Sequence, residues 1–149
     1  MTTPSIEFLT PERIVELRDV LVPLFQQSCD GNEISKDNLT PDDILAFALV
    51  GDAAVFLGCE DGEPTCVLAI QFFVEGAKKG ADVLALAGRG LTTFKKHYWQ
   101  VILDWLRANE VRYLDAYVDE SRAKVYQSRF GFGKSCALVR MDLMEASHG

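Results

Sequence analysis

The stretch from Ala81 to Val118 constrains the fold more than any other part of the sequence. An apolar run, "ADVLALA", is followed by the turn "GRG" and then by a long amphipathic segment. Apolar side chains recur in that segment at helical spacing, at Phe94, Tyr98, Val101, Ile102 and Trp105. This pattern predicts a helix from about Thr92 to Asn109, before a second strand, "VRYLDAYV". Because a long helix between two strands forms a crossover connection, we expect the two strands to be parallel.

The first half of the chain predicts one strand, two helices and an antiparallel meander. The strand is "SIEFL", and the helices begin with Thr-Pro in "TPERIVELRDVLVPLFQQS" and "TPDDILAFALV", where threonine caps and proline suits the first turn. Pro23 is expected to kink the first helix or end it early. The runs "AAVFLGCE", "TCVLAIQFFVEG" and "ADVLALA" are separated by the turns "DGEP" and "AKKG", which favour hairpins.

The end of the chain predicts a short helix, "SRAKVYQSRFG", and a last strand, "KSCALVRMDL". The whole order gives a mixed α/β fold. We expect a central, mostly antiparallel sheet with one parallel strand pair, flanked by about four helices. Since the chain has 149 residues and no linker or repeat, we predict a single domain over residues 1–149.

Charge and cysteine content exclude several classes of function. The net charge of −7 argues against nucleic acid as a main partner, because phosphate contacts need clustered Lys and Arg. It permits a cationic substrate or a basic protein partner, and the alternative is that it serves only solubility. The four cysteines form no CxxC pair and only two histidines accompany them, so no metal site is expected. No apolar run is long enough for a membrane span, and no signal peptide is visible. We expect a cytoplasmic protein with reduced thiols.

Four stretches resemble the GNAT superfamily of acyl-CoA N-acyltransferases. "DGEPTCVLAI" is similar to the family's hairpin into its third strand, and "ADVLALAGRG" to its fourth strand and the start of its pyrophosphate loop. The long helix with "VRYLDAYV", and then "RAKVYQSRFGF", follow in the family's order. The resemblance is to a divergent member, of the kind that phages also encode. It implies a GNAT-like fold and acetyl-CoA as co-substrate.

The family's pyrophosphate loop usually reads Arg or Gln, two residues, Gly, one residue, then Gly or Ala. Two registers match it in part. In the first, Gly88 and Gly90 are the small residues, and an alanine replaces the Arg or Gln. In the second, which gives the more usual helix length, Arg89 and Gly90 open the loop. Thr92 and Phe94 then replace the later small residues, and Phe94 is expected to obstruct the phosphates.

The resemblance implies that the backbone and the helix start after this strand hold the cofactor. A helix N-terminus binds anions without any fixed motif, because its first amides have no helical partner. The residues expected to bind the cofactor are Leu86, Ala87, Arg89, Gly90, Thr92 and Thr93. The alternative is a plain strand-to-helix turn in which Thr92 is the N-cap.

The family often places an Asn three residues before the Ala of its short helix and a Tyr four residues after it. The Tyr acts as general acid toward the leaving thiolate. Here Ala123 has Glu120 and Gln127 at those places, and Tyr126 comes one residue early. One position turns a helical side chain by about 100°. Tyr126 is therefore the candidate acid if the helix begins differently, and ordinary packing is the alternative.

Asp115 is the candidate general base, since it lies in an otherwise apolar and aromatic strand. Strand alternation would place it between Tyr113 and Tyr117 on one face, where its pKa is expected to rise or where it orients an amine. The alternative is a carboxylate satisfied by a tyrosine hydroxyl or solvent. Glu75 is a second candidate. Backbone N–H groups near Leu86 would polarise the thioester carbonyl.

These features lead to two expected functions of different classes. The first is transfer of an acetyl group from acetyl-CoA to a primary amine of a small molecule or a protein, by direct attack in a ternary complex. The alternative is a catalytically degenerate GNAT-like protein that binds another protein, or that holds CoA as a sensor. The loop "CDGNEISKDN" is expected on the acceptor side, and an exposed last strand would permit a homodimer.

Overall fold

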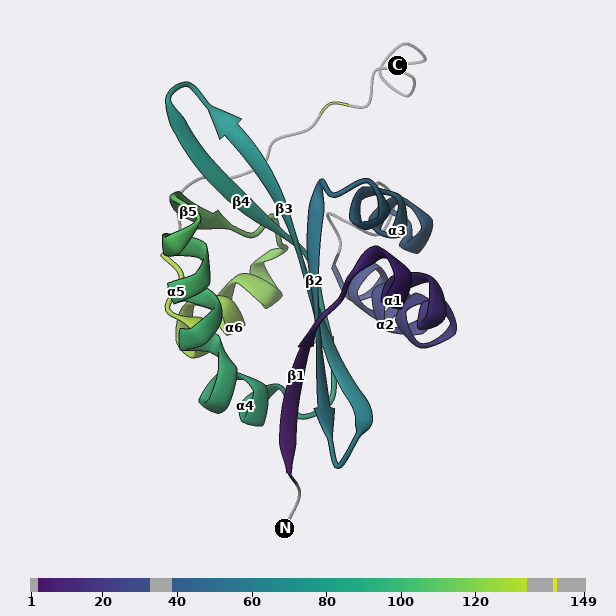
Figure 1. Ribbon diagram of the computed structural model, residues 1–149. Coiled ribbons are helices and arrows are strands. Elements are labelled where there is room, and N and C mark those ends of the chain that lie inside the picture. Colours follow the sequence, from purple (N-terminus) through teal and green to yellow (C-terminus); the bar gives the residue numbers. More distant parts are fainter. Residues whose placement is uncertain (1–2, 33–38, 134–140, 142–149) are drawn as a thin grey trace. The chain divides into compact units, whose positions relative to one another are not determined.

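The computed structural model describes residues 3–32, 39–133 and 141, which belong to two compact units, 1–119 and 120–149. The single domain remains a prediction. The first unit holds a five-stranded sheet in the order β1-β2-β3-β4-β5 (Figure 1). Its strands are β1 (Pro4–Phe8), β2 (Ala53–Glu60), β3 (Glu63–Glu75), β4 (Lys78–Gly88) and β5 (Val111–Asp115). Neighbours are antiparallel except β4 and β5, which are parallel, so the predicted mixed sheet is confirmed.

Two tight hairpins form the meander. Asp61 and Gly62 connect β2 to β3, and their φ angles of 52° and 81° are the positive values that a two-residue Asp-Gly turn requires. The next turn is Gly76–Ala77, so the predicted turn "AKKG" is misplaced. Lys78 already pairs with Glu75 in the β3–β4 ladder, because β4 begins there.

The helices α1 (Pro11–Glu16), α2 (Arg18–Asp30) and α3 (Pro41–Leu49) cover one face of the sheet (Figure 1). Thr40 and Asp43 form the reciprocal capping box of α3. The prediction that Pro23 ends its helix early is wrong, since α2 continues to Asp30 and the interruption lies at Leu17. The turns after Pro23 bury Phe25 and Cys29, and this packing outweighs the hydrogen bond that proline removes.

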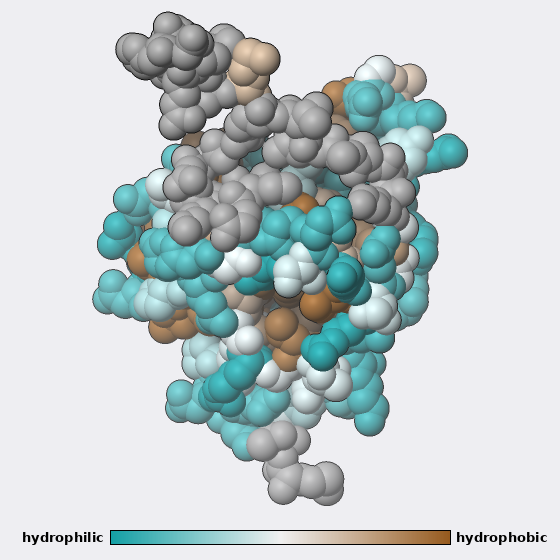
Figure 2. Space-filling view, turned by 180° about the vertical axis from the view of Figure 1, so that it is seen from behind, coloured by the Kyte–Doolittle hydropathy of each residue, from teal (hydrophilic) through white to brown (hydrophobic). Residues whose placement is uncertain are grey.

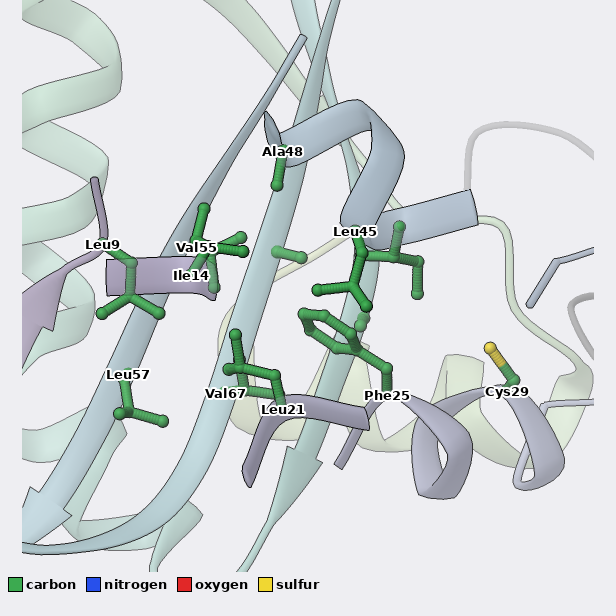
Figure 3. Close-up of a cluster of buried hydrophobic side chains, with 13 residues drawn as sticks. Leu9, Ile14, Leu21, Phe25, Cys29, Leu45, Ala48, Val55, Leu57 and Val67 are labelled. Atoms are coloured by element: carbon green, nitrogen blue, oxygen red, sulfur yellow. The ribbon is translucent and has the colours of Figure 1, made fainter. Parts of the chain in front are cut away.

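The main core lies between these helices and the sheet. Alternate residues of β2, Val55 and Leu57, point to this face and are each 1% exposed. They meet Leu21 and Phe25 of α2, which are fully buried and contribute about 1.5–3 kcal/mol each. Figure 3 shows these side chains pointing toward one another from the helices and the strands.

The opposite face carries the predicted long helix, which is confirmed. It runs without a break through α4 (Leu91–Phe94), one π-helical turn η1 (Lys95–Trp99) and α5 (Gln100–Ala108). Trp105 of α5 packs on the sheet against Phe8, Phe56 and Phe72, with ring centroids 5.8, 5.4 and 6.0 Å away. This helix therefore fixes where the chain leaves β4 and where β5 begins.

The second unit contains α6 (Glu120–Phe130), which ends at Gly131 with a φ of 79° and confirms the predicted short helix. The predicted last strand, residues 134–143, lies outside the described residues apart from Met141. No described helix is long and apolar enough to cross a membrane. Figure 2 shows that hydrophilic side chains occupy most of the surface in that view, with a small hydrophobic group near its centre.

Candidate active site

Strands β4 and β5 separate partway along their length. Residues 79–82 of β4 pair with β5, and the last pair is Asp82 with Asp115. Beyond it, no other described strand pairs with this edge of β4, which continues to Gly88. The β3–β4 register also shifts here and leaves Leu84 as an extra residue, a β-bulge. The edge at residues 83–88 therefore presents backbone groups that an extended ligand can pair with.

One donor of this edge already has a partner. The Leu86 N–H donates to Ser28 Oγ of α2 over 3.1 Å, and both residues are buried. Leu86 is one of the predicted cofactor-binding residues, and Ala87 beside it is buried in the same strand. The Leu86 N–H, which was expected to polarise a thioester carbonyl, therefore already donates to the Ser28 hydroxyl.

Asn32, one turn after Ser28, links the end of α2 to the segment that follows β5. Its Nδ2 donates to the Tyr117 carbonyl over 2.9 Å, and its Oδ1 accepts from the Asp119 N–H over 3.2 Å. The end of α2 thus contacts β4 through one residue and the chain after β5 through another. Sequence reasoning assigned Asn32 only to an acceptor-side loop and missed Ser28, because neither belongs to a motif.

Two acidic residues are neighbours at the point where the strands separate. Asp82 and Asp115 are partners in the β4–β5 register, and Oδ1 of Asp82 is buried without a hydrogen-bond partner among the described residues. Burial, together with the charge of Asp115, raises the pKa of Asp82 to about 6. Sequence reasoning named Asp115 and missed Asp82. The signal was available, since Asp82 is also a lone carboxylate in an apolar run.

The tyrosines expected around Asp115 have other roles. Tyr113 and Asp115 are two residues apart in β5 and share a face of the strand, as predicted. Strand β5 ends at Asp115, however, so alternation does not extend to Tyr117 and that part of the prediction is wrong. The Tyr113 hydroxyl accepts a hydrogen bond from Lys78 Nζ over 3.1 Å, which lowers the pKa of Tyr113. Glu75 is exposed at the tip of the β3–β4 hairpin, opposite Lys78, and lies apart from the carboxylate pair.

The turn after β4 needs both of its glycines. Gly88 has a φ of 114°, and a Cβ there would overlap the Thr65 backbone carbonyl. Gly90 has a φ of 71°. The N–H of Arg89 donates to the Thr65 carbonyl over 2.8 Å, which fixes the turn against β3, and the Arg89 side chain is exposed.

The helix after this turn begins at Leu91 with Gly90 as its N-cap, and no described side chain caps it. The alternative in which Thr92 is the N-cap is therefore wrong. The first helical bond runs from the Phe94 N–H to the Gly90 carbonyl over 2.9 Å. The amides of Leu91, Thr92 and Thr93 precede that bond and are the donors that a helix start offers to an anion.

Phe94 does not obstruct this helix start, contrary to expectation. It is 2% exposed, and its ring packs toward the sheet, near Gly58 and 6.1 Å from the ring of Tyr98. An open depression of about 180 Å³ lies beside it and includes Thr93, Glu60 and Gly90 in its lining. A Cβ on Gly90 would lie 2.8 Å from Glu60 Oε1, so a carboxylate stands next to the loop.

Tyr126 lies in α6 of the second unit. It is 6% exposed, and its ring contacts those of Phe130 and Phe132, with centroids 5.9 and 5.1 Å away. Burial raises the pKa of Tyr126 to about 12, so the phenol keeps its proton at neutral pH. Its role as an acid stays a prediction. Among the described residues, no cluster of His, Cys, Asp and Glu suits a metal ion.

Comparison with known proteins finds likeness in structure alone. No protein-family model and no curated protein matches the sequence. An aminoglycoside acetyltransferase from an uncultured soil metagenomic sample matches at 15% identity and a TM-score of 0.66, over 95% of this chain and 99% of that one. A predicted acetyltransferase from Clostridium acetobutylicum, solved with acetyl-CoA, matches at 9% identity and a TM-score of 0.67, over 96% and 98%. A ribosomal-protein-alanine N-acetyltransferase from Brucella melitensis matches at 14% identity and a TM-score of 0.63, over 94% and 100%.

Proposed function

We propose that this chain, which has the fold of the GNAT superfamily, transfers an acetyl group from acetyl-CoA to a primary amine. The proposal is supported by two neighbouring sets of backbone donors. One is the edge of β4 over residues 83–88, with which no other described strand pairs, and the other is the helix start at Leu91. An extended arm with amide groups pairs with a strand edge, and a pyrophosphate is held by a helix start.

The residues of these two sets fit the cofactor. Gly88 and Gly90 let the backbone approach a ligand, and the first amides of α4 have no side-chain cap among the described residues. Arg89 is exposed beside them and adds a positive charge. The neighbouring solved structure from C. acetobutylicum contains acetyl-CoA, which supports the same ligand class here.

Asp82 is the residue best suited to accept the proton of the amine. Its pKa of about 6 lets it act as a base near neutral pH, and its Oδ1, which has no hydrogen-bond partner among the described residues, can accept a hydrogen bond from the amine. Asp115 raises the basicity of Asp82 and adds a second negative charge that favours a cationic amine. We therefore propose Asp82 as the general base, in place of Asp115, the candidate that the sequence suggested.

The reaction balances with the chain's own residues and solvent. Bound acetyl-CoA supplies an activated acyl carbon and a thiolate leaving group. A cationic amine first gives one proton to the solvent. The neutral nitrogen then bonds to the acyl carbon, the carbon–sulfur bond breaks, and Asp82 takes the proton that the nitrogen loses as the amide forms; that proton returns through solvent to the group that protonates the thiolate. The Leu86 N–H stabilises the charge that develops on the carbonyl oxygen. Tyr126 is the proposed proton donor to the thiolate, since its phenol is protonated at neutral pH.

The test is release of the CoA thiol from acetyl-CoA, followed with a thiol reagent across a panel of amines and a lysine peptide. Amine-dependent release with an acetylated product supports the proposal. Tight binding of acetyl-CoA with no release for any amine contradicts it.

The degenerate, protein-binding alternative has its own support. Ser28 already occupies the Leu86 donor, and the Glu60 carboxylate stands beside the loop where phosphates would bind. Failure to bind both acetyl-CoA and CoA would favour that alternative over acyl transfer.

A further inference from the structure

The hydrogen bond between Ser28 and Leu86 uses the donor that the proposed function needs. One N–H serves one acceptor well, so Ser28 Oγ and a carbonyl oxygen of a bound ligand exclude each other at this site. We propose that Ser28 Oγ stands in for a carbonyl oxygen of the acyl-pantetheine arm, so that acyl-CoA binds by displacing this hydroxyl. The inference rests on the proposed function.

Burial of the Leu86 N–H explains why it needs a hydroxyl partner before the ligand binds. Leu86 is 6% exposed and Ser28 is 7% exposed, so water has little access to this N–H. A buried N–H without a partner is costly, and the serine hydroxyl satisfies it before the ligand arrives. The strand edge is thereby kept closed to other extended segments.

Displacement requires only a side-chain rotation. Phe25 and Cys29 of α2 are 0% and 1% exposed, and this packing holds the helix backbone in place. A serine has three staggered rotamers, and in a helix its hydroxyl can turn back to the carbonyl four residues earlier, here that of Leu24. The hydroxyl therefore has another partner after it leaves Leu86.

The consequence is that the free protein weakens its own cofactor binding by the strength of one neutral hydrogen bond. Ser28→Ala removes the competitor without adding bulk and is expected to tighten binding by roughly three- to tenfold. Ser28→Cys replaces the hydroxyl with a slightly larger thiol that is a poor acceptor, so it is expected to act in the same direction. The matched control is Ser128→Ala, because Ser128 is exposed in α6 and its hydroxyl donates to the nearby Val125 carbonyl.

The experiment is calorimetric titration of the full chain with acetyl-CoA and with free CoA, and thermal unfolding confirms that each variant is folded. Tighter binding of Ser28→Ala or Ser28→Cys to both ligands supports the inference and assigns a pantetheine amide oxygen. Tighter binding to acetyl-CoA alone supports it and assigns the thioester oxygen. Equal or weaker binding in both variants, with a wild type that binds, overturns the inference and leaves the proposed function standing. Binding by no form overturns both.

Discussion

Asp82 lies where a strand would ordinarily carry an apolar residue. Its neighbours in β4, Ala81 and Val83, are apolar, and its register partner is another carboxylate, Asp115. Burial and like charge both disfavour its ionised form, so the residue is held in a state that costs stability at neutral pH. Such a cost is typical of residues kept for chemistry.

Asp82→Asn is expected to lower turnover by about 100-fold or more while acetyl-CoA binding is unchanged, because the amine loses its base. In the wild type, kcat/KM should rise with pH through about 6 as Asp82 loses its proton. Asp115→Asn is the control. It should keep most of the turnover, raise the KM for a cationic amine, and move the midpoint to lower pH, since it removes one negative charge and one cause of the raised pKa of Asp82. Equal loss of turnover in the two variants would contradict the assignment of Asp82 alone as the base.

Replacing Asp82 with Asn is also expected to stabilise the folded protein above pH 6. The native state binds the Asp82 proton more tightly than the unfolded chain does, because its pKa is about 6 rather than the ordinary 3.8. Stability therefore falls as the pH rises from about 4 to about 6, and Asp82→Asn avoids that loss. We expect the variant to have a Tm roughly 2–4 °C above that of the wild type at pH 8, and no gain at pH 4. A variant that is less stable at pH 8 would contradict the assigned pKa shift.

At the scale of elements, the turn from β4 into α4 depends on close backbone approach. Gly88→Ala should cost about 3 kcal/mol or more of unfolding free energy, because its Cβ would overlap the backbone of β3. Gly62→Ala is the matched control. It has a similarly positive φ of 81° with open space around it, so it should cost only about 1 kcal/mol. Chemical denaturation measures both, and equal costs would mean that the close approach to Thr65 is unimportant.

The elements themselves could be predicted because their signals are local. The Thr-Pro starts, the Asp-Gly turn and the helical period from Phe94 to Trp105 each act over a few residues, and the structure confirms them. The helix did not end at Pro23 because the hydrogen bond that proline removes is offset by the burial of Phe25 against the sheet. The start of β4 was misplaced because Lys78 and Lys79 resemble turn residues until their partners on β3 are known.

The site could be predicted less well, because its geometry joins distant parts of the chain. Ser28 and Leu86 are 58 residues apart, and Asn32 and Tyr117 are 85 residues apart. No spacing rule connects such pairs. Asp115 was found because it is a carboxylate in an apolar and aromatic strand. Asp82 becomes a candidate base only when the β4–β5 register shows that it lies next to Asp115.

At the scale of the whole molecule, the proposed role of Tyr126 needs a test of its own, because Tyr126 belongs to the compact unit 120–149 and Asp82 to the unit 1–119. If Tyr126 is the acid, Tyr126→Phe should lower kcat by about 10-fold or more and leave acetyl-CoA binding unchanged, because only the hydroxyl is lost. Phe132→Leu serves as control for packing, since it removes the ring contact with Tyr126 and keeps the phenol. Loss of binding in step with kcat would show that Tyr126 only packs.

The net charge of −7 acts over the whole molecule as well. It attracts a cationic amine and opposes an anionic cofactor at long range, so cofactor binding depends on the local donors at the start of α4. Thr92 is exposed in the first turn of that helix. A carboxylate there suits the helix dipole and leaves the fold intact, while it repels a pyrophosphate.

The most direct test of the account is therefore calorimetric titration of acetyl-CoA into the wild type, Thr92→Glu and its neutral counterpart Thr92→Gln. We expect binding by the wild type and Thr92→Gln, and affinity lower by about tenfold or more in Thr92→Glu, which is about 1.4 kcal/mol. Equal affinity in all three forms would place the cofactor elsewhere, and no binding by the wild type would contradict the proposal that this chain uses acetyl-CoA.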